Sequence, residues 1–414
     1  MRPLLARLSA ALLAAALQAC VNAPVQAPVT PAAAEAEVRA PVTILISIDG
    51  FRPDYLQRGI TSVMSALAAG GVSGALTPSF PSKTFPNHWT LVTGLTPDQH
   101  GIVANRMEDA GRPGQVFTMA NDDPFWWNTA APIWIEAERA AVRSGTVFWP
   151  GSNVSFGGER PADWLQFNKA LPEANRVQTV LDWVGRRPLI RPRFVTLYFD
   201  SVDDAGHHDG PDAAATNTAI ALVDAEIGRL RDGLAAMNQP ANLVIVSDHG
   251  MIATSGNRVV RVDALVAGAG RVVEDGPYAT FEPLPGREAA LAAVLTRPHP
   301  HMQCWRKGDL PARFAYGRNA RVPAWLCLGE SGWLLARQTP DANYLGGNHG
   351  YDPALPEMAA VFVANGPAFR SGARLNGPVA NTGVAPLLRA VLGLPAGAGD
   401  GALVREALAG PTGQ

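Results

Sequence analysis

The sequence predicts an α/β fold, a three-layer sandwich in which helices cover both faces of a mainly parallel sheet. Several short runs rich in Val, Ile and Leu have the length and composition of fully buried strands. Residues 212–237 place apolar side chains at helical spacing and charged side chains on the other faces. Strands that alternate with helices are typical of a parallel sheet. The clearest strand candidates are residues 42–48, 194–199, 243–246 and 359–363.

The composition indicates a folded protein with a large core. Of its 414 residues, 47% are hydrophobic and 17% are charged, a balance that excludes general disorder. The formal net charge of -2 provides no basic stripe to grip the phosphates of a long nucleic acid. Any nucleotide that this protein binds is therefore expected to be small.

The first 20 residues have the layout of a signal peptide. Two arginines precede an Ala- and Leu-rich stretch that ends in Leu17-Gln18-Ala19-Cys20, which resembles the lipidation site of bacterial lipoproteins. The alternative is ordinary signal cleavage nearby, with Cys20 lost, and either route exports the protein. Residues 21–40 are rich in Ala, Pro and Val and are predicted to form an extended tether.

Membrane attachment is expected only through an N-terminal lipid. No segment after the signal peptide is long and apolar enough to span a bilayer. Val21 follows Cys20 in place of the aspartate that retains bacterial lipoproteins in the inner membrane. We therefore expect a periplasmic protein that is anchored to the outer membrane.

Residues 41–410 are predicted to form the catalytic domain. Within them, residues 259–337 are rich in Gly and Pro and have weak periodicity, which indicates an insertion or cap on the same domain. Cys304 and Cys327 lie in this segment, and a disulfide between them is favoured in an exported protein. Two free thiols are the alternative, and zinc binding is less favoured because neither has a second cysteine at ligand spacing.

Acidic and histidine residues follow three of the predicted strands, where ligands bind in sheets of this class. Five such residues follow these strands, and His349 is a sixth candidate, in the glycine-rich run Gly346-Gly347-Asn348-His349-Gly350. Any one of these residues is more often a helix cap or a turn residue. Because zinc readily takes imidazole nitrogen and carboxylate oxygen, the group as a whole predicts a metal site. Its members are Asp49, Asp203, His207, Asp248, His249 and His349.

Thr84 is a candidate nucleophile at the start of a helix. It precedes Pro86 and an amphipathic stretch, residues 89–92, so it is placed like an N-cap with a proline in the first turn. A hydroxyl there lies in the positive field of the helix terminus, where anions bind. The alternative is a capping threonine with no other role.

Seven motifs occur in the order seen in nucleotide pyrophosphatase/phosphodiesterases, so the sequence resembles that branch of the alkaline phosphatase superfamily from Val42 to about Phe369. The motifs are Ile48-Asp49-Gly50-Phe51-Arg52, Lys83-Thr84-Phe85-Pro86-Asn87-His88, Gly101-Ile102-Val103-Ala104-Asn105, Phe148-Trp149-Pro150-Gly151-Ser152, Asp203-Asp204-Ala205-Gly206-His207, Ser247-Asp248-His249-Gly250-Met251 and Asn348-His349-Gly350-Tyr351-Asp352.

The resemblance implies two zinc ions in an alkaline-phosphatase-like fold. One zinc would be held by Asp203, His207 and His349, and the second by Asp49, Asp248, His249 and the Thr84 oxygen. Asn105 would hold a non-bridging phosphate oxygen together with the backbone N–H of Thr84. Phe85 and Tyr198 would stack on a nucleotide base, with core packing the alternative for Tyr198, and Trp149 would shape the pocket wall. Lys83 could attract an anionic substrate, or be an exposed lysine beside a helix start.

The implied reaction is zinc-dependent hydrolysis of phosphodiester or pyrophosphate bonds in nucleotides and related small molecules. Thr84 would attack phosphorus and form a covalent phosphothreonine ester, and the product would be a nucleoside monophosphate. A phospholipase C-like or phosphomonoesterase activity on the same two-zinc site is the alternative. A phosphate monoester carries more negative charge than a diester and needs additional positive groups around it. Arg52 and Arg106 are the only arginines near Thr84 and the ligand motifs, and this small number favours diesters.

Overall fold

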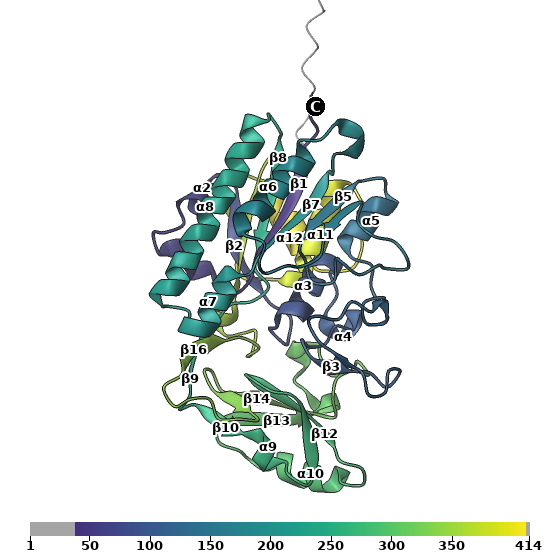
Figure 1. Cartoon of the computed structure of the whole chain (residues 1–414), viewed down its shortest axis with the longest axis vertical. Coiled ribbons are helices and arrows are strands. Elements are labelled where there is room, and N and C mark those ends of the chain that lie inside the picture. Colours follow the sequence, from purple (N-terminus) through teal and green to yellow (C-terminus); the bar gives the residue numbers. More distant parts are fainter. Residues whose placement is uncertain (1–37, 411–414) are drawn as a thin grey trace, which may run out of the picture. The chain divides into compact units, whose positions relative to one another are not determined.

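A nine-stranded sheet forms the centre of the computed structural model, which describes residues 38–410 (Figure 1). The predicted signal peptide and all but the last three residues of the predicted tether lie outside the described residues. Residue 40 begins a unit that contains all the elements below. The order across the sheet is β18 (Ala373–Arg374), β2 (Val72–Thr77), β17 (Ala360–Asn365), β8 (Ala241–Val246), β1 (Val42–Ile48), β7 (Phe194–Phe199), β5 (Ser144–Val147) and β6 (Asp163–Leu165), with β19 (Val379–Ala380) also paired to β2.

The sheet is mainly parallel, as predicted. β1 pairs in parallel with β7 on one side and with β8 on the other, and β5 continues the parallel set beside β7. The strands predicted at residues 42–48 and 194–199 have these bounds in the structure, and β8 begins two residues before the predicted 243–246. The run predicted at 359–363 forms β17, which is antiparallel to β8 and β2.

One face of the sheet is covered by α2 (Ser62–Gly70), α6 (Glu173–Val184) and α8 (Ala214–Ala236). The helix predicted over residues 212–237 is α8. Successive side chains of a strand point to opposite faces, so Ile44 and Ile46 of β1 join the core on this side and Leu45 joins the core on the other. This alternation explains why β1 is an uninterrupted apolar run.

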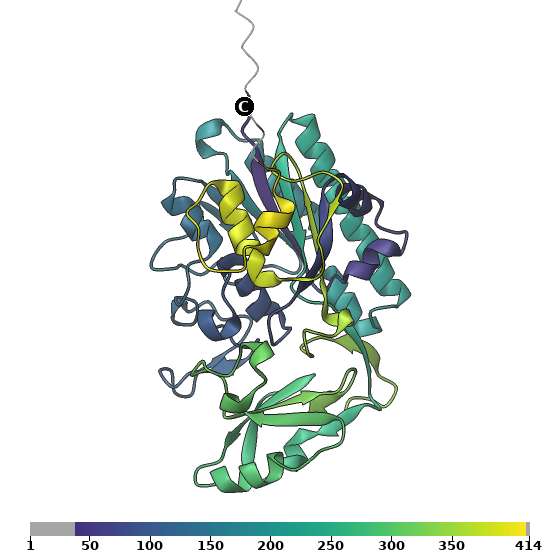
Figure 2. The same ribbon diagram turned by 180° about the vertical axis from the view of Figure 1, so that it is seen from behind.

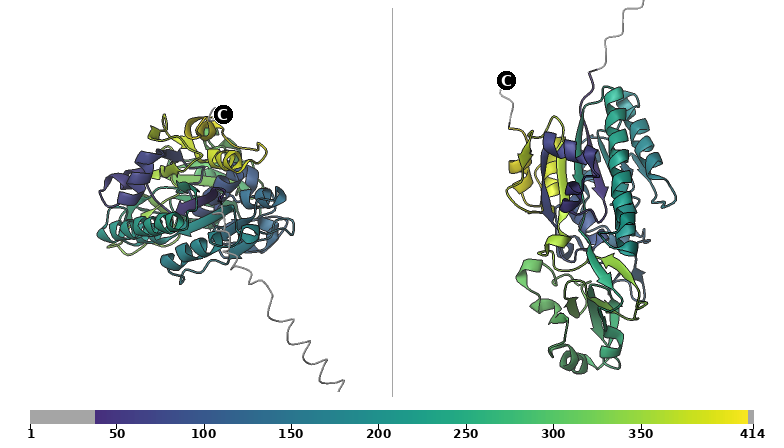
Figure 3. Two further views of the ribbon diagram at one scale, coloured as in Figure 1. Left: turned by 90° about the horizontal axis from the view of Figure 1, so that it is seen from above. Right: turned by 90° about the vertical axis from the view of Figure 1, so that its left-hand side faces the viewer.

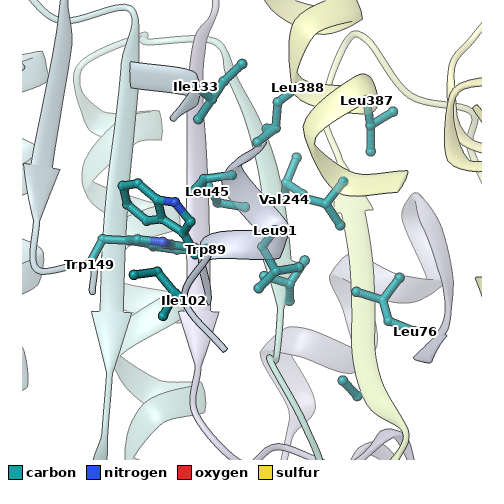
Figure 4. Packing of buried hydrophobic residues seen from close by; sticks show 14 of the residues in the cluster. Leu45, Leu76, Trp89, Leu91, Ile102, Ile133, Trp149, Val244, Leu387 and Leu388 are labelled. Carbon is teal, nitrogen blue, oxygen red and sulfur yellow. The ribbon is translucent and has the colours of Figure 1, made fainter. Parts of the chain in front are cut away.

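The second face is covered by α3 (Thr84–Thr93), α5 (Ile133–Arg139), α11 (Val384–Leu392) and α12 (Ala402–Ala407), which pack on one another as well as on the sheet (Figures 2 and 3). Figure 4 shows Trp89 and Leu91 of α3 and Leu388 of α11 beside Leu45 of β1. Helices on both faces make this the predicted three-layer sandwich.

A smaller antiparallel sheet is formed within residues 259–337. Its order is β11 (Gly270–Glu274), β12 (Tyr278–Pro283), β14 (Trp325–Gly329) and β13 (Met302–Arg306), and α9 (Val262–Leu265) and α10 (Glu288–Leu295) pack beside it. We call these residues the small subdomain. Cys304 and Cys327 are directly opposite each other on β13 and β14 and form a disulfide, which confirms the favoured pairing.

Polar contacts fasten the small subdomain to the segment that follows α3. Arg321 is mostly buried, and its guanidinium donates to the Asp109 carboxylate at 2.6 Å and to the carbonyl oxygens of Gly101 and Trp126. The Asp98 carboxylate, in α4 (Pro97–His100), accepts three backbone N–H groups from residues 317–319. These contacts tie the subdomain to the stretch that carries Asn105.

Within residues 38–410, no helix combines the length and the apolar character that a membrane span requires.

We predict that Arg321→Met destabilises the protein by about 2 kcal/mol, because the Asp109 carboxylate and two carbonyl oxygens lose a buried donor. Urea unfolding would measure this. The matched control is Arg318→Met, at an exposed arginine three residues away, for which we expect a change within about 0.5 kcal/mol. Equal stability of the two variants would contradict the assignment of Arg321 as a fastening residue.

Candidate active site

The candidate residues meet because the three strands that precede them are neighbours in the sheet. Asp49 directly follows β1, α7 (Ser201–Asp209) begins two residues after β7, and Asp248 and His249 follow β8. These strands lie side by side in the order β7, β1, β8 and run in parallel, so their carboxyl ends share one edge. Ligands bind at this edge in α/β sheets. Helices α3 and α7 also lie toward this end of the sheet (Figure 1).

A first cluster consists of Asp203, His207 and His349. Asp203 and His207 are four residues apart on α7, so they share one face of the helix, and His349 follows β16 (Leu345–Asn348). One ligand atom from each residue lies within 4.8 Å of the others. His207 Nε2 is 3.4 Å from Asp203 Oδ2, and His349 Nε2 is 3.8 Å from Asp203 Oδ1. This arrangement can hold one metal ion.

Two glycines of β16 allow this cluster to form. A Cβ on Gly347 would lie 2.5 Å from the carbonyl oxygen of Gly206, and one on Gly346 would lie 2.4 Å from that of His207. Both carbonyls belong to α7, so any larger residue would push β16 away from the helix. The glycines quoted from the sequence therefore bring His349 within reach of Asp203.

A second cluster surrounds His249. Its Nε2 lies 2.9 Å from Asp248 Oδ2, 3.3 Å from Asp49 Oδ1 and 3.2 Å from the Thr84 hydroxyl. The turn after β1 needs Gly50, which has φ +68° and approaches Asp203 closely. The His249 and His349 rings stack at 3.4 Å, so the two clusters adjoin.

All three candidate histidine ligands are oriented in the same way. His207, His249 and His349 each place Nδ1 at 2.8–2.9 Å from a backbone carbonyl, of Gly347, Gly250 and Ser82 respectively. A carbonyl only accepts, so Nδ1 carries a proton, and in the neutral imidazole Nε2 then keeps its lone pair. Nε2 is in each case the nitrogen that faces the carboxylates. Backbone carbonyls commonly orient metal-ligating histidines in this manner.

His88 lies close to Asp49 and Asp248 and competes with His249 as a ligand on distance alone. Its Nδ1, however, is 2.9 Å from the Thr84 carbonyl and must be protonated to donate there, and its Nε2 faces the Ser47 hydroxyl at 2.8 Å. Neither ring nitrogen is free for a metal. His88 instead braces the backbone of Thr84, in agreement with its exclusion from the sequence-based ligand set.

Burial of the carboxylates sets the electrostatics of the site. One oxygen each of Asp49, Asp203 and Asp248 is buried without a hydrogen-bond partner. Burial, and then repulsion from Asp248 and Asp203, raises the pKa of Asp49, and burial raises the pKa of Asp203. Burial acts in the same direction on Asp248, but His249 and His88 outweigh it and lower its pKa. Divalent cations fit these residues, because they would give the orphaned oxygens a partner and relieve the repulsion.

Thr84 is the first residue of α3 rather than its N-cap, which is Lys83. Pro86 lies in the first turn as predicted. The helix is not amphipathic: apart from Phe85, its residues are buried, because α3 is packed between the sheet and α11. The hydroxyl of Thr84 still lies beside N–H groups that have no partner within the helix.

A hydrogen bond orients the side chain of Asn105: the Phe85 backbone N–H donates to Asn105 Oδ1 at 3.0 Å. This contact uses the acceptor of the amide and leaves its NH2 group as a donor. Both residues line the pocket beside Thr84. Asn105 can therefore donate to an anionic oxygen next to the hydroxyl.

Lys83 is buried, so the interpretation of it as an exposed lysine is wrong, and it is not among the residues that line the pocket. Its side chain is buried, and Nζ donates to Asn348 Oδ1 at 3.3 Å. The same oxygen accepts the backbone N–H of His349. Burial lowers the pKa of Lys83, although the nearby Glu274 of the small subdomain opposes this.

The clusters open into a pocket of about 500 Å³, a size that suits a nucleotide. Of the predicted aromatic residues, Tyr198 donates its hydroxyl to Asp49 at 2.6 Å, and Trp149 donates to the His88 carbonyl at 3.1 Å. Both rings are buried, whereas Phe85 is half-buried in the pocket wall. Sequence analysis missed Phe167, which lines the same pocket with 49% of its surface exposed. Its place two residues after β6, at this edge of the sheet, is the signal that could have revealed it.

The remaining histidines lie outside the site. His100 is buried, and its ring forms hydrogen bonds with Thr90, the Pro86 carbonyl and the Ile102 N–H. His208 is exposed, and His299 and His301 lie in the small subdomain, partly exposed. None of the four shares a cluster with the candidate ligands in the described part of the chain.

Comparison with known proteins gives a consistent result. Residues 43–352 match the family of type I phosphodiesterases and nucleotide pyrophosphatases. A bis(5'-adenosyl)-triphosphatase of Xenopus laevis is 35% identical over 368 residues, which cover 88% of this chain and 80% of that protein. Human ectonucleotide pyrophosphatase/phosphodiesterase 5 has a similar structure, with a TM-score of 0.84 and 33% identity over 89% of this chain and all of that one. Its murine form, an inactive threonine-to-alanine variant in complex with AMP, aligns with the same coverage and TM-score at 32% identity.

We predict that Gly347→Ala weakens the binding of a divalent metal ion about tenfold or more, because the new methyl group separates β16 from α7 and disturbs the hydrogen bond that orients His207. Competition with a fluorescent chelator would measure the affinity. Gly308→Ala serves as control, since a Cβ there meets nothing within 4 Å. An unchanged metal affinity in Gly347→Ala would show that the close approach of β16 to α7 is not needed for the cluster.

Proposed function

Because the chain belongs to the nucleotide pyrophosphatase/phosphodiesterase family of the alkaline phosphatase superfamily, we propose that this enzyme binds two zinc ions and cleaves nucleotide phosphodiester or pyrophosphate bonds through Thr84. Asp203, His207 and His349 would hold one ion. Asp49, Asp248, His249 and the Thr84 oxygen would hold the other. Residues 41–410 would act as the catalytic domain, with the small subdomain as an insertion in it.

The orientation of the three histidines is the observation that carries this proposal. His249 and His349 turn Nε2 toward carboxylate oxygens that have no hydrogen-bond partner, and His207 turns Nε2 toward the other oxygen of Asp203. The threonine hydroxyl at the start of α3 lies 3.2 Å from His249 Nε2. Imidazole nitrogen and carboxylate oxygen in groups of three or four are the ligand sets that zinc takes. Two zinc ions held by these residues would supply positive charge near the reacting oxygens and lower the pKa of a hydroxyl group.

Thr84 is then the group that attacks. Its oxygen forms a bond to phosphorus as the bond to the leaving group breaks, and the hydroxyl proton passes to solvent. Asn105 donates through its NH2 group to a non-bridging phosphate oxygen, together with the backbone N–H of Thr84. His88 holds the carbonyl of Thr84, so the nucleophile keeps its position during the displacement. The result is a phosphothreonine ester.

Water completes the reaction by attacking from the side that the leaving group has vacated. The bond from phosphorus to the Thr84 oxygen breaks, and a nucleoside monophosphate is released. Two displacements with inversion give net retention of configuration at phosphorus. Phe85 and Phe167 supply exposed aromatic surface in the pocket for a base, and the AMP complex of the murine relative supports a nucleotide as the ligand.

The pocket favours diesters over monoesters. A phosphate monoester carries an additional negative charge, which calls for additional positive groups around the phosphate. Among the residues that the structure describes, the largely exposed Lys169 is the one lysine or arginine that lines the pocket. The sequence-based expectation for diesters therefore has structural support, and the bis(5'-adenosyl)-triphosphatase relative indicates that dinucleoside polyphosphates are worth testing.

The test compares a nitrophenyl nucleotide diester with nitrophenyl phosphate, using protein that lacks residues 1–20. We expect turnover of the diester that is lost on zinc removal and restored by zinc. Thr84→Ala should lower kcat by about a thousandfold or more while zinc content stays unchanged, and Thr84→Ser should retain part of the activity. A monoester preference would reject the assigned substrate class, and full turnover by Thr84→Ala would reject the mechanism.

We also propose that the protein is exported and carries a lipid on Cys20, as the sequence pattern favours. The full-length chain produced in a bacterium should then appear in the outer membrane fraction, and mass spectrometry should find a diacylglycerol-modified N-terminal cysteine. Cys20→Ser should release the protein from that fraction. A soluble periplasmic wild-type protein would instead favour ordinary signal cleavage.

A further inference from the structure

Lysine is rare in this chain, and one lysine lies at the mouth of the pocket. Only three of the 34 basic residues are lysines: Lys83, Lys169 and Lys307. Lys169 is on the loop between β6 and α6, two residues after Phe167, and its side chain is 66% exposed. Among the described residues that line the pocket, it is the one lysine or arginine.

The position of Lys169 relative to the metal clusters is set by its contact with α7. Lys169 Nζ is 2.5 Å from Asp204 Oδ2, and Asp204 directly follows Asp203 of the first cluster. Thr84 belongs to the second cluster, through His249. In a displacement by Thr84, the leaving group is on the far side of phosphorus from the Thr84 oxygen. Lys169 lines the pocket beside the first cluster, on the side toward which we expect the leaving group to extend.

The charges nearby leave Lys169 available for an anion. Asp200, which also lines the pocket, is already paired with the buried Arg176 at 2.6 Å. The partner of Lys169 is Asp204, which is 46% exposed, and ion pairs this open to water contribute little to stability. The hydrogen bond to Asp204 raises the pKa of Lys169, so its ammonium group is charged at neutral pH. A phosphate offers this ammonium several charged acceptors in place of one carboxylate.

We propose that Lys169 is a specificity-determining residue that binds the phosphate of the leaving group and favours substrates in which this group itself carries phosphate. The substrate class is nucleoside di- and triphosphates and dinucleoside polyphosphates, in contrast to diesters with an uncharged leaving group. The inference rests on the proposed function, since it assumes attack by Thr84. The two metal ions would neutralise the carboxylates that hold them and the phosphate under attack, and Lys169 supplies charge for the next phosphate.

The experiment compares two substrates that share one nucleoside monophosphate and differ in the leaving group: ATP, which loses pyrophosphate, and the nitrophenyl ester of AMP. Lys169→Gln should lower kcat/KM for ATP about tenfold and change that for the nitrophenyl ester less than about twofold. Lys169→Arg should keep most of the ATP activity. Lys307→Gln, at the lysine in the small subdomain, is the matched control and should change neither substrate.

Asp204→Asn separates substrate binding from a purely structural ion pair. If Lys169 serves the substrate, freeing it from Asp204 should leave ATP turnover unchanged or lower its KM. If the ion pair only holds the loop against α7, Asp204→Asn and Lys169→Gln should impair both substrates alike, and that outcome overturns the proposal. An equal loss or no loss on both substrates in Lys169→Gln also overturns it.

Binding gives a readout that does not depend on turnover. In the Thr84→Ala protein with zinc bound, calorimetry should show that ATP binds more tightly than AMP. The additional substitution Lys169→Gln should lower the ratio of the AMP and ATP dissociation constants about tenfold. An unchanged difference contradicts the role of Lys169. Failure of the wild-type protein to hydrolyse the nitrophenyl ester would instead contradict the proposed function, so the two failures are distinguishable.

Discussion

The rest of the site depends on three neighbouring carboxylates, each of which has a buried oxygen without a hydrogen-bond partner. Asp49, Asp203 and Asp248 meet because the parallel strands β7, β1 and β8 end at one edge of the sheet. Charge of this density inside a protein is costly without cations. Three groups with positive or partly positive character lie around these carboxylates: the histidine rings, the N-terminus of the helix that begins at Thr84, and Lys169 at the mouth of the pocket.

Two hydrophobic cores, one on each face of the sheet, hold this edge in place. One core, with α2, α6 and α8, packs behind β1 and β7 and carries the first turn of α7. The other core surrounds α3, so the helix that presents Thr84 is clamped along its whole length. The nucleophile and the ligands are thus joined both through the sheet and by direct contacts, such as that of His349 Nδ1 with the Ser82 carbonyl oxygen. A reacting group held in this way keeps its position as charge develops.

Sequence reasoning worked best where one residue type implies one environment. Buried strands are apolar runs, and their carboxyl ends indicated where Asp49, Asp203 and His249 would meet. It failed where the environment depends on tertiary packing. Charged residues are usually exposed, yet Lys83 is buried beside Asn348 and Gly350, with Gly276 of the small subdomain nearby. Phe167 was missed because its loop has no periodicity, and its exposure in the pocket follows from a register between β5 and β6 that sequence alone does not reveal.

The chain order of the ligands has a consequence for biosynthesis. His349 follows β16, and the whole small subdomain is translated between His249 and His349. A nascent chain therefore possesses five of the six side-chain ligands long before the last one emerges, and the first cluster stays open until the subdomain has been made and β16 has docked on α7. All three ligands of that cluster are therefore present only once the chain has been made through residue 349, and β17, which lies inside the sheet between β2 and β8, is translated later still.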